Sequence, residues 1–243
     1  MQMPQPGRHR GEPWDKPSDP NLVLWRYMDL ARFVSLLKTK QLFFSRADSL
    51  QDRFEGSLTK SNYEMRARVG AVGGSQRRLR ERVYVNCWFA QNQQSTAMWN
   101  IYGGSASSVA IRTTYGKLIA VLPEQTPIGS PNVGLIDYID RAAEGSPYPS
   151  DWRNEFQPFF QKNIEYSYEH ELRIMIAKLY VEVETDPNIY LPKDVKIISE
   201  TGLVCPITSF IDLIDMVYVN FEAKKWFWDV VNGSPSISFP LLG

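Results

Sequence analysis

The sequence predicts a single α+β domain in which helices flank a split or mixed β-sheet. The chain has 243 residues, of which 43% are hydrophobic and 22% are charged, ordinary values for a globular domain with a sizeable core. Strand-like and helix-like patterns follow one another without the regular alternation of a doubly wound parallel sheet. Five prolines lie among glycine and charged residues in residues 1–20, which predicts a flexible arm, so the folded domain is expected at residues 21–243.

Apolar periodicity and turn residues place the individual elements. The apolar run of residues 22–27 predicts a strand, and Asp29 is the expected N-cap of a helix whose apolar residues recur at helical spacing up to Leu37. Further strands are expected at 42–45, 83–89, 108–112, 133–139, 166–183, 196–198 and 216–219, and further helices at 95–102, 114–122, 150–163 and 223–231.

Global charge and the few metal-binding residue types exclude several classes of protein. Lys plus Arg equals Asp plus Glu at 27 each, so net charge indicates no polyanionic partner. Cys87 and Cys205 lie in apolar runs, which favours buried free thiols and a reducing cytoplasm. The two histidines and the lack of a Cys-x-x-Cys pair argue against a zinc site. No apolar run predicts a membrane helix or a signal peptide, so we expect a cytoplasmic protein.

One segment is locally basic. Residues 60–82 hold seven Lys or Arg residues against two Glu residues, interrupted by glycines, which predicts a helix, a loop and a second helix. Such a segment is either a solvated helix face or a binding surface for nucleic acid or another phosphate-rich partner.

The expected strand at 166–183 has charged residues at alternate positions, which makes it the most informative charge pattern of the sequence. Its alternation puts Tyr168, His170 and Leu172 on one, mainly apolar face, where His170 is expected to be a hydrogen-bonded core histidine. Glu169, Glu171 and Arg173 fall on the other face and therefore share a surface. That surface is either a solvated face with an ion pair or part of a site.

The chain as a whole resembles a widespread bacterial family catalogued as a domain of unknown function, number 2971. The similarity covers about residues 22–231, and Arg53 stands where the family more often has proline. The matching segments are Leu24-Trp25-Arg26-Tyr27, Leu42-Phe43-Phe44-Ser45, Asp52-Arg53-Phe54-Glu55, Cys87-Trp88-Phe89, Met98-Trp99-Asn100-Ile101-Tyr102-Gly103, Tyr168-Glu169-His170-Glu171-Leu172-Arg173 and Ala223-Lys224-Lys225-Trp226.

The layout of that family is similar to the ADP-ribosyltransferase fold. In that fold a first strand bears Arg or His, a second bears Ser or Tyr, and a later one carries the catalytic Glu, often as Glu-x-Glu. The resemblance places Arg26, Ser45 and the pair Glu169 and Glu171 at these positions. It implies a bacterial NAD-consuming enzyme, such as a toxin or a phage-defence effector, that transfers ADP-ribose to a protein or nucleic acid or hydrolyses NAD.

The same resemblance assigns roles to residues. Breaking the nicotinamide–ribose bond passes through an oxocarbenium-like cation, which the Glu171 carboxylate would stabilise while Glu169 orients or deprotonates the nucleophile. Arg26 would hold the pyrophosphate of NAD with its fork of donors. Ser45 and the aromatic side chains Phe44 and Trp99 would complete the binding site, and no metal is expected.

Other interpretations use the same residues. Arg26 could be a cation stacked on an aromatic surface, Ser45 a polar strand residue, and Trp99 a core residue. Asp52 and Glu55 could cap a following helix. Alternatively, Asp52 and Glu55 could join Glu169 and Glu171 in binding Mg²⁺, as in a carboxylate-metal phosphohydrolase.

Overall fold

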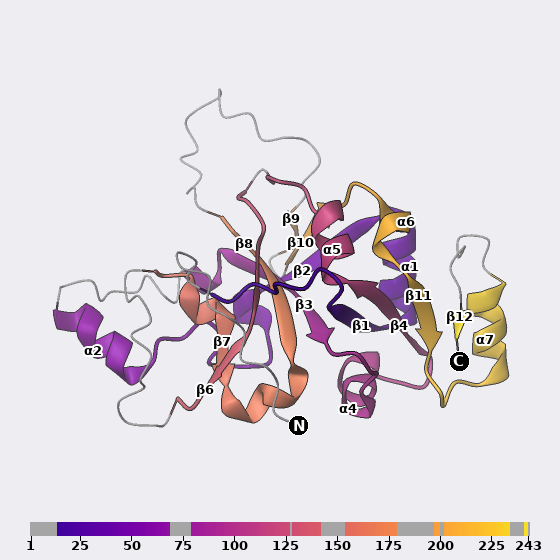
Figure 1. Ribbon diagram of the computed structural model, residues 1–243, viewed down its shortest axis with the longest axis horizontal. Helices are drawn as coiled ribbons and strands as arrows, with labels where there is room; N and C mark the ends of the chain where they lie inside the picture. Colours follow the sequence, from indigo (N-terminus) through magenta and orange to yellow (C-terminus); the bar gives the residue numbers. More distant parts are fainter. Residues whose placement is uncertain are drawn as a thin grey trace. The chain divides into compact units, whose positions relative to one another are not determined.

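The computed structural model describes residues 14–68, 79–126, 128–141, 154–178, 197–199, 202–233 and 241–242. It has a mixed α/β fold with flanking helices, as the sequence predicts, and its sheet is mostly antiparallel and open (Figure 1). The chain divides into two compact units. The first comprises Met1–Ser18, Phe43–Asn86 and Glu124–Cys205, and the second comprises Asp19–Leu42, Cys87–Pro123 and Pro206–Gly243.

The second unit contains one edge-to-edge run of strands in the order β12, β11, β4, β1 and the end of β3. Strand β1 pairs antiparallel with β4 and with β3, β11 pairs antiparallel with β4, and β12 pairs parallel with β11. The strands are β1 (Val23–Asp29), β3 (Val83–Ala90), β4 (Ser108–Thr114), β11 (Met216–Val219) and β12 (Leu241–Leu242). The helices are α1 (Leu30–Thr39), α4 (Thr96–Met98), the π-helix η2 (Trp99–Gly103), α5 (Tyr115–Val121), α6 (Phe210–Leu213) and α7 (Lys225–Asn232).

A side-chain cap and a left-handed residue explain where helix α1 begins and ends. The Asp29 carboxylate accepts a hydrogen bond from the Arg32 N–H (2.8 Å), which confirms the expected N-cap. At the other end, Lys40 adopts a left-handed conformation with φ 54°, and its N–H donates to the Leu36 carbonyl. Thr114 caps α5 in the same way as Asp29 caps α1, by accepting from the Lys117 N–H.

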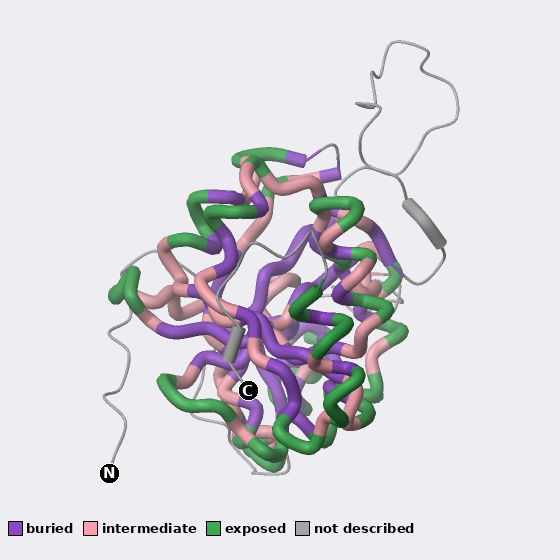
Figure 2. The backbone as a smooth tube through the Cα atoms, turned by 90° about the vertical axis from the view of Figure 1, so that its right-hand side faces the viewer, coloured by how far each residue is buried: buried purple, intermediate pink, exposed green. Residues whose placement is uncertain are grey.

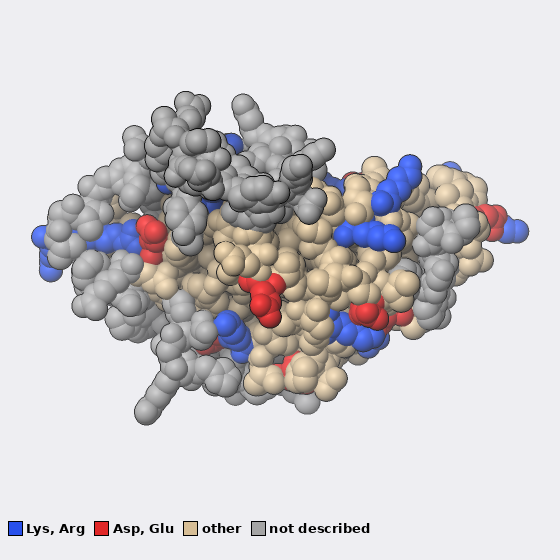
Figure 3. Space-filling view, turned by 90° about the horizontal axis from the view of Figure 1, so that it is seen from above, with Lys and Arg blue, Asp and Glu red and all other residues tan. Residues whose placement is uncertain are grey.

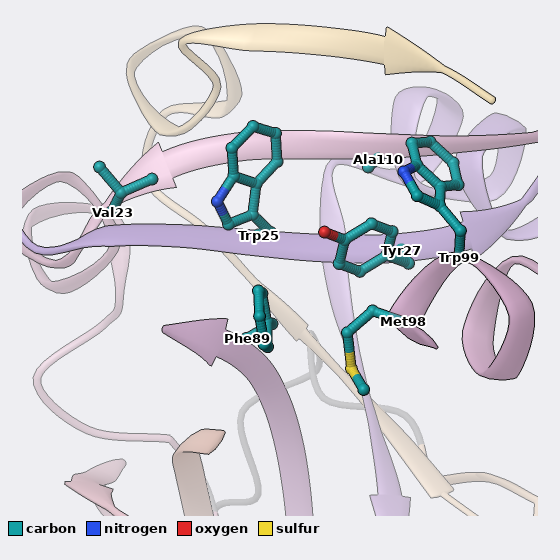
Figure 4. Close-up of a cluster of buried hydrophobic side chains, with 7 residues drawn as sticks. All are labelled: Val23, Trp25, Tyr27, Phe89, Met98, Trp99 and Ala110. Atoms are coloured by element: carbon teal, nitrogen blue, oxygen red, sulfur yellow. The ribbon is translucent and has the colours of Figure 1, made fainter. Parts of the chain in front are cut away.

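Aromatic side chains fill the core of the second unit. Figure 4 shows a buried cluster in which the Tyr27 ring lies edge-on to Trp99 and Phe89, with centroids 5.0 and 6.2 Å apart. Tyr27 and Trp25 project from β1, whereas Trp99 comes from η2. Most residues of β1 are buried, and Figure 2 draws the buried segments of the backbone in purple. The long aromatic side chains of this part of the sequence therefore stabilise packing between sheet and helix.

The first unit holds most residues of the remaining strands. The start of β3 is followed across the sheet by β2, β10 and β9, while β8 pairs with β3 and with β5. These strands are β2 (Gln41–Arg46), β5 (Asn132–Leu135), β8 (Glu171–Ala177), β9 (Ile197–Ser199) and β10 (Gly202–Pro206). A separate two-stranded parallel sheet is formed by β6 (Asp137–Ile139) and β7 (Gln161–Asn163). The helices are η1 (Ala47–Ser49), α2 (Lys60–Arg68), η3 (Gln157–Phe160) and η4 (Ile164–Glu169).

Two predicted elements of the first unit are wrong in detail. The strand expected at 133–139 is two strands, because β5 pairs with β8 and β6 pairs with β7. The helix expected at 150–163 is absent from the described residues 154–163, which form the 3₁₀-helix η3 and strand β7. Pro158 lies in the first turn of η3, where a missing backbone N–H is tolerated but a longer helix is not favoured. Residues 150–153 lie outside the described part of the chain.

The strand expected at 166–183 begins five residues late. Residues Ile164–Glu169 form η4, which the Asn163 side chain caps by accepting from the Ile164 N–H. His170 then adopts a left-handed conformation with φ 37°, which breaks any strand at this point, and β8 starts at Glu171. All seven residues of β8 are buried, so of the two interpretations of the charged surface the solvated face is wrong. Residues 179–183 lie outside the described residues.

Part of the expected N-terminal arm is ordered. The Trp14 ring stacks on Phe160, with centroids 4.2 Å apart, and the Asp15 carbonyl accepts from the Leu135 N–H at 2.8 Å. Gly134 permits this approach, because a Cβ there would lie against the Trp14 ring and 3.1 Å from the Asp15 carbonyl oxygen. Residues 1–13 lie outside the described residues. None of the described helices has the length and apolarity needed to cross a membrane.

Candidate functional site

Five charged side chains of the first unit form what we call the buried charge cluster: Glu55, Lys162, Glu169, Glu171 and Arg173. Their residues are only 0 to 7% exposed, although Lys, Glu and Arg are rarely buried unless paired. They come from the turn after η1, from β7, from η4 and from β8. Charges buried at this cost are retained where they pair with one another or serve a site.

Glu171 lies between two cations. Its Oε1 accepts from Arg173 Nε at 2.7 Å, and its Oε2 lies 2.8 Å from the Lys162 ammonium. Residues two apart on a strand point to the same face of the sheet, so the sequence correctly predicts that Glu171 and Arg173 lie on the same face. The Glu171 backbone N–H donates to the Tyr138 hydroxyl (2.8 Å), which fixes the start of β8 against β6.

Glu169 reaches the same place from a different element. It is the last residue of η4 and not part of the strand, yet its carboxylate also forms an ion pair with the Lys162 ammonium. One nitrogen atom therefore contacts the carboxylates of both Glu169 and Glu171. The predicted proximity of the two carboxylates is confirmed, but its cause is the shared lysine and not the alternation of a strand.

Arg173 is anchored by Glu55. Its guanidinium binds the Glu55 carboxylate in a bidentate manner, with Nη2 3.2 Å from Oε2 and Nη1 bound to Oε1. Nη1 also donates to the Phe159 carbonyl. Both side chains are fully excluded from solvent. Burial outweighs the nearby Arg173 and raises the pKa of the Glu55 carboxyl above its ordinary value.

A tight turn of the backbone places Glu55 in the buried charge cluster. Asp52 closes this turn, because its Oδ1 accepts from the Phe54 N–H at 2.8 Å and its carbonyl accepts from the Glu55 N–H at 3.1 Å. Gly56 follows with φ 65°, in the region that favours glycine. The expectation that Glu55 caps a helix is wrong, since its carboxylate binds Arg173, whereas Asp52 does cap the local backbone.

Three residues at the edge of the cluster were not singled out from the sequence: Tyr138, Arg141 and Tyr166. Arg141 joins the turn to β7 by donating to the carbonyls of Ser57 (2.7 Å) and Gln161 (3.2 Å). The Tyr166 ring lies 5.5 Å from the Lys162 ammonium. Burial, and then the Glu171 charge, raise the pKa of the Tyr138 hydroxyl.

Lys162 itself was also missed. The available signal is a lysine two positions after the aromatic run Phe159-Phe160, in a segment that starts in the core. A lysine there requires a buried anionic partner. Nothing local identifies that partner as the Glu169 and Glu171 pair.

The other predicted site residues of the first unit are Phe44 and Ser45 on β2. Phe44 is fully buried, so its ring has no solvent-facing side in this conformation. Ser45 lies opposite Val85 in the antiparallel pairing of β2 with β3 and is half-buried.

Arg26 and Trp99 belong to the second unit. The Arg26 guanidinium lies 5.6 Å from the centre of the Trp88 ring, which agrees with the interpretation of a cation stacked on an aromatic surface. Burial lowers the pKa of Arg26 to about 10. The Trp99 indole N–H donates to the Gln94 side chain at 3.0 Å, and the ring is buried in the cluster of Figure 4.

The carboxylates of the cluster do not resemble a metal site. Among the described residues, no group of three or more His, Cys, Asp or Glu side chains is arranged to hold a metal ion. Lys162 and Arg173 instead occupy the positions beside the glutamates that a cation would take. This arrangement disfavours the phosphohydrolase hypothesis.

The basic segment 60–82 is only partly described, since residues 69–78, with Arg77 and Arg78, lie outside. Arg66 is buried and therefore faces away from a phosphate-rich partner, and Arg80 donates to the Arg53 carbonyl at 3.1 Å. On the face drawn in Figure 3, the described Lys and Arg side chains are scattered among Asp and Glu side chains. The described residues thus provide no observation that favours a nucleic-acid surface.

Comparisons of the chain with protein-family models, with curated proteins and with solved structures found no match. The chemistry of the buried charge cluster is therefore argued from its own geometry.

Proposed function

We propose that the chain is an NAD-consuming enzyme of the ADP-ribosyltransferase type, in which Glu171 is the principal catalytic carboxylate and Glu169 assists it. One observation carries the proposal: the two carboxylates converge on a single nitrogen atom, that of Lys162. The resemblance to the Glu-x-Glu pattern of that fold adds support, and so does the burial of both side chains. A carboxylate held away from water stabilises a developing cation more strongly than a solvated one.

The chemistry would be a substitution at the ribose carbon that bears nicotinamide. The carbon–nitrogen bond breaks and its electron pair leaves with nicotinamide, while the ribose becomes oxocarbenium-like beside Glu171. A water molecule or an acceptor hydroxyl then forms the new carbon–oxygen bond and gives its proton to Glu169. With water the products are nicotinamide, ADP-ribose and one proton.

The remaining roles follow from the resemblance. Ser45 of the first unit would contact the nicotinamide ribose. Phe44 is buried, so we assign it to supporting the binding site through packing and not to stacking on a ring.

The test is nicotinamide release from NAD by the full chain, with and without cell extract as a source of acceptors. Glu171→Gln keeps the shape of the side chain and is expected to lower the rate by about 10²–10³-fold. Glu165→Gln is the matched control, because Glu165 is exposed and lies six residues away on η4. Absence of both NAD binding and nicotinamide release by the wild type over a broad range of conditions contradicts the proposal.

A further inference from the structure

Lys162 lies where the Glu169 and Glu171 carboxylates meet. Its side chain is 9% exposed, and its ammonium contacts Oε2 of Glu171 at 2.8 Å and Oε2 of Glu169. The lysine projects from β7, an element to which neither glutamate belongs. Its ammonium therefore joins side chains of three consecutive elements, β7, η4 and β8.

Two carboxylates this close repel each other unless a cation lies between them. Lys162 supplies that cation for both side chains at once. Arg173 holds the opposite oxygen of Glu171 at 2.7 Å and is itself anchored by Glu55. Glu171 is thus held from two sides by groups that are themselves held in place.

We infer that Lys162 is a positioning residue, which holds the Glu169 and Glu171 carboxylates together so that both face the same ribose carbon. The catalytic consequence rests on the proposed function, whereas the positioning itself does not.

Other titratable groups lie close to Glu171 and affect any titration measured at its carboxyl. Tyr138 from β6, Glu55 from the turn, Arg173 from β8 and Glu169 from η4 all lie against Glu171 or its partners. The variants below leave all of these groups in place, so differences between the variants report the charge of residue 162.

The first measurement is independent of activity. The full chain carries ¹³C at the glutamate carboxyls, and the Glu171 signal is assigned as the one lost in Glu171→Gln. In Lys162→Met the Glu171 carboxyl is expected to titrate at a higher pH than in the wild type, because removal of a cation favours the protonated acid. In Lys162→Arg, which keeps the charge, the titration returns toward that of the wild type. The same Glu171 titration in Lys162→Met and in the wild type overturns the inference.

Lys162→Met could fail to fold, and the wild type then supplies the test. The ¹⁵Nζ signal of Lys162, identified as the lysine signal lost in the folded Lys162→Arg variant, is expected to shift at the pH at which the Glu171 carboxyl titrates. Independent behaviour of the two signals overturns the inference.

The second measurement is nicotinamide release. Lys162→Met is expected to lower kcat by about 10²-fold or more with little change in KM, and Lys162→Arg to retain activity within about tenfold of the wild type. Lys117→Met, which removes an exposed lysine paired with Asp215 in the second unit, is the matched control. If the wild type releases no nicotinamide but the Glu171 titration still depends on Lys162, the proposed function fails and the inference stands. If nicotinamide is released and is insensitive to Lys162→Met, the inference fails and the proposed function stands.

Discussion

The carboxylate of Glu55 and the guanidinium of Arg173, 118 residues apart in sequence, form a bidentate ion pair from which solvent is fully excluded. Such a pair is costly to desolvate, so its burial alone is weak evidence of stabilisation. Its effect is to fix Arg173, and through it Glu171, relative to the turn that carries Asp52. Loss of one partner leaves a buried charge without compensation, so breaking the pair destabilises far more than the intact pair stabilises.

Replacing Glu55 by Gln is expected to destabilise the first unit strongly. Removing one partner of a buried ion pair typically costs about 3–5 kcal/mol, because the remaining charge stays desolvated. Urea unfolding measures this loss. Asp215→Asn is the control, since it breaks the half-exposed pair of Asp215 with Lys117, and such pairs contribute only about 0–1 kcal/mol. Equal losses in the two variants would contradict the role given to burial.

Gly56 and Gly104 form a natural pair for testing the turn that carries Glu55. Both have positive φ, 65° and 71°, so replacing either by Ala costs about 1 kcal/mol of backbone strain. At Gly56 an added Cβ would also lie 2.7 Å from Cδ1 of the buried Phe159, whereas at Gly104 nothing lies within 4 Å. We therefore expect Gly56→Ala to lose about 1–3 kcal/mol more than Gly104→Ala in urea unfolding. A smaller loss at Gly56 than at Gly104 would show that the turn relaxes.

Cys205 is expected to make stability fall at alkaline pH. Burial raises the pKa of its thiol from 9.0 to about 11. Below pH about 9 the thiol is protonated in both the folded and the unfolded chain, so its contribution is fully present. As the pH rises toward 11, only the unfolded chain ionises, so this contribution is progressively lost, by about 2–3 kcal/mol in total.

The measurement is urea unfolding at about pH 8 and about pH 10.5, where Cys205→Val should lose less stability than the wild type. The other titrating groups are common to both chains and cancel in the comparison. A thiol reagent gives an independent check, because Cys205 is buried and Cys87 is half-buried. In Cys87→Ser the folded chain should react slowly and the urea-unfolded chain rapidly.

The parts of the fold that the sequence predicts well are those with local signals. The Asp29 cap, the apolar spacing after it and the short apolar runs at β2, β3 and β4 identify α1 and its neighbouring strands, since each depends on residues close in sequence. Predictions from the apolar pattern fail at Pro158, where a 3₁₀-helix replaces the expected helix, and at the left-handed His170, where the expected strand is interrupted. A 3₁₀-helix is usually too short for its three-residue period to be read from the sequence, and a single left-handed residue has no period.

In the candidate site, too, the sequence predicts what depends on neighbouring residues and misses what depends on distant ones. Alternation places Glu171 and Arg173 on one face, but it cannot tell a buried face from a solvated one when charges occupy it. Burial here depends on Glu55 and Lys162, which lie in other segments and whose pairing is a property of the folded chain. A sequence therefore supplies the catalytic candidates, while their partners require the three-dimensional arrangement.

His170 connects the two proposed catalytic residues, and its conformation gives the last prediction. With φ 37° it lies where Gly and Asn are tolerated and β-branched residues are not, so His170→Asn should retain stability while His170→Val loses about 1–2 kcal/mol. Lys40→Val is the control, because Lys40 has φ 54° and caps α1 in the second unit. Both valine variants should lose similar stability, but only His170→Val should slow nicotinamide release, since it alters the turn between Glu169 and Glu171. If Lys40→Val slows release equally, strain in general and not the placement of the two carboxylates accounts for the effect.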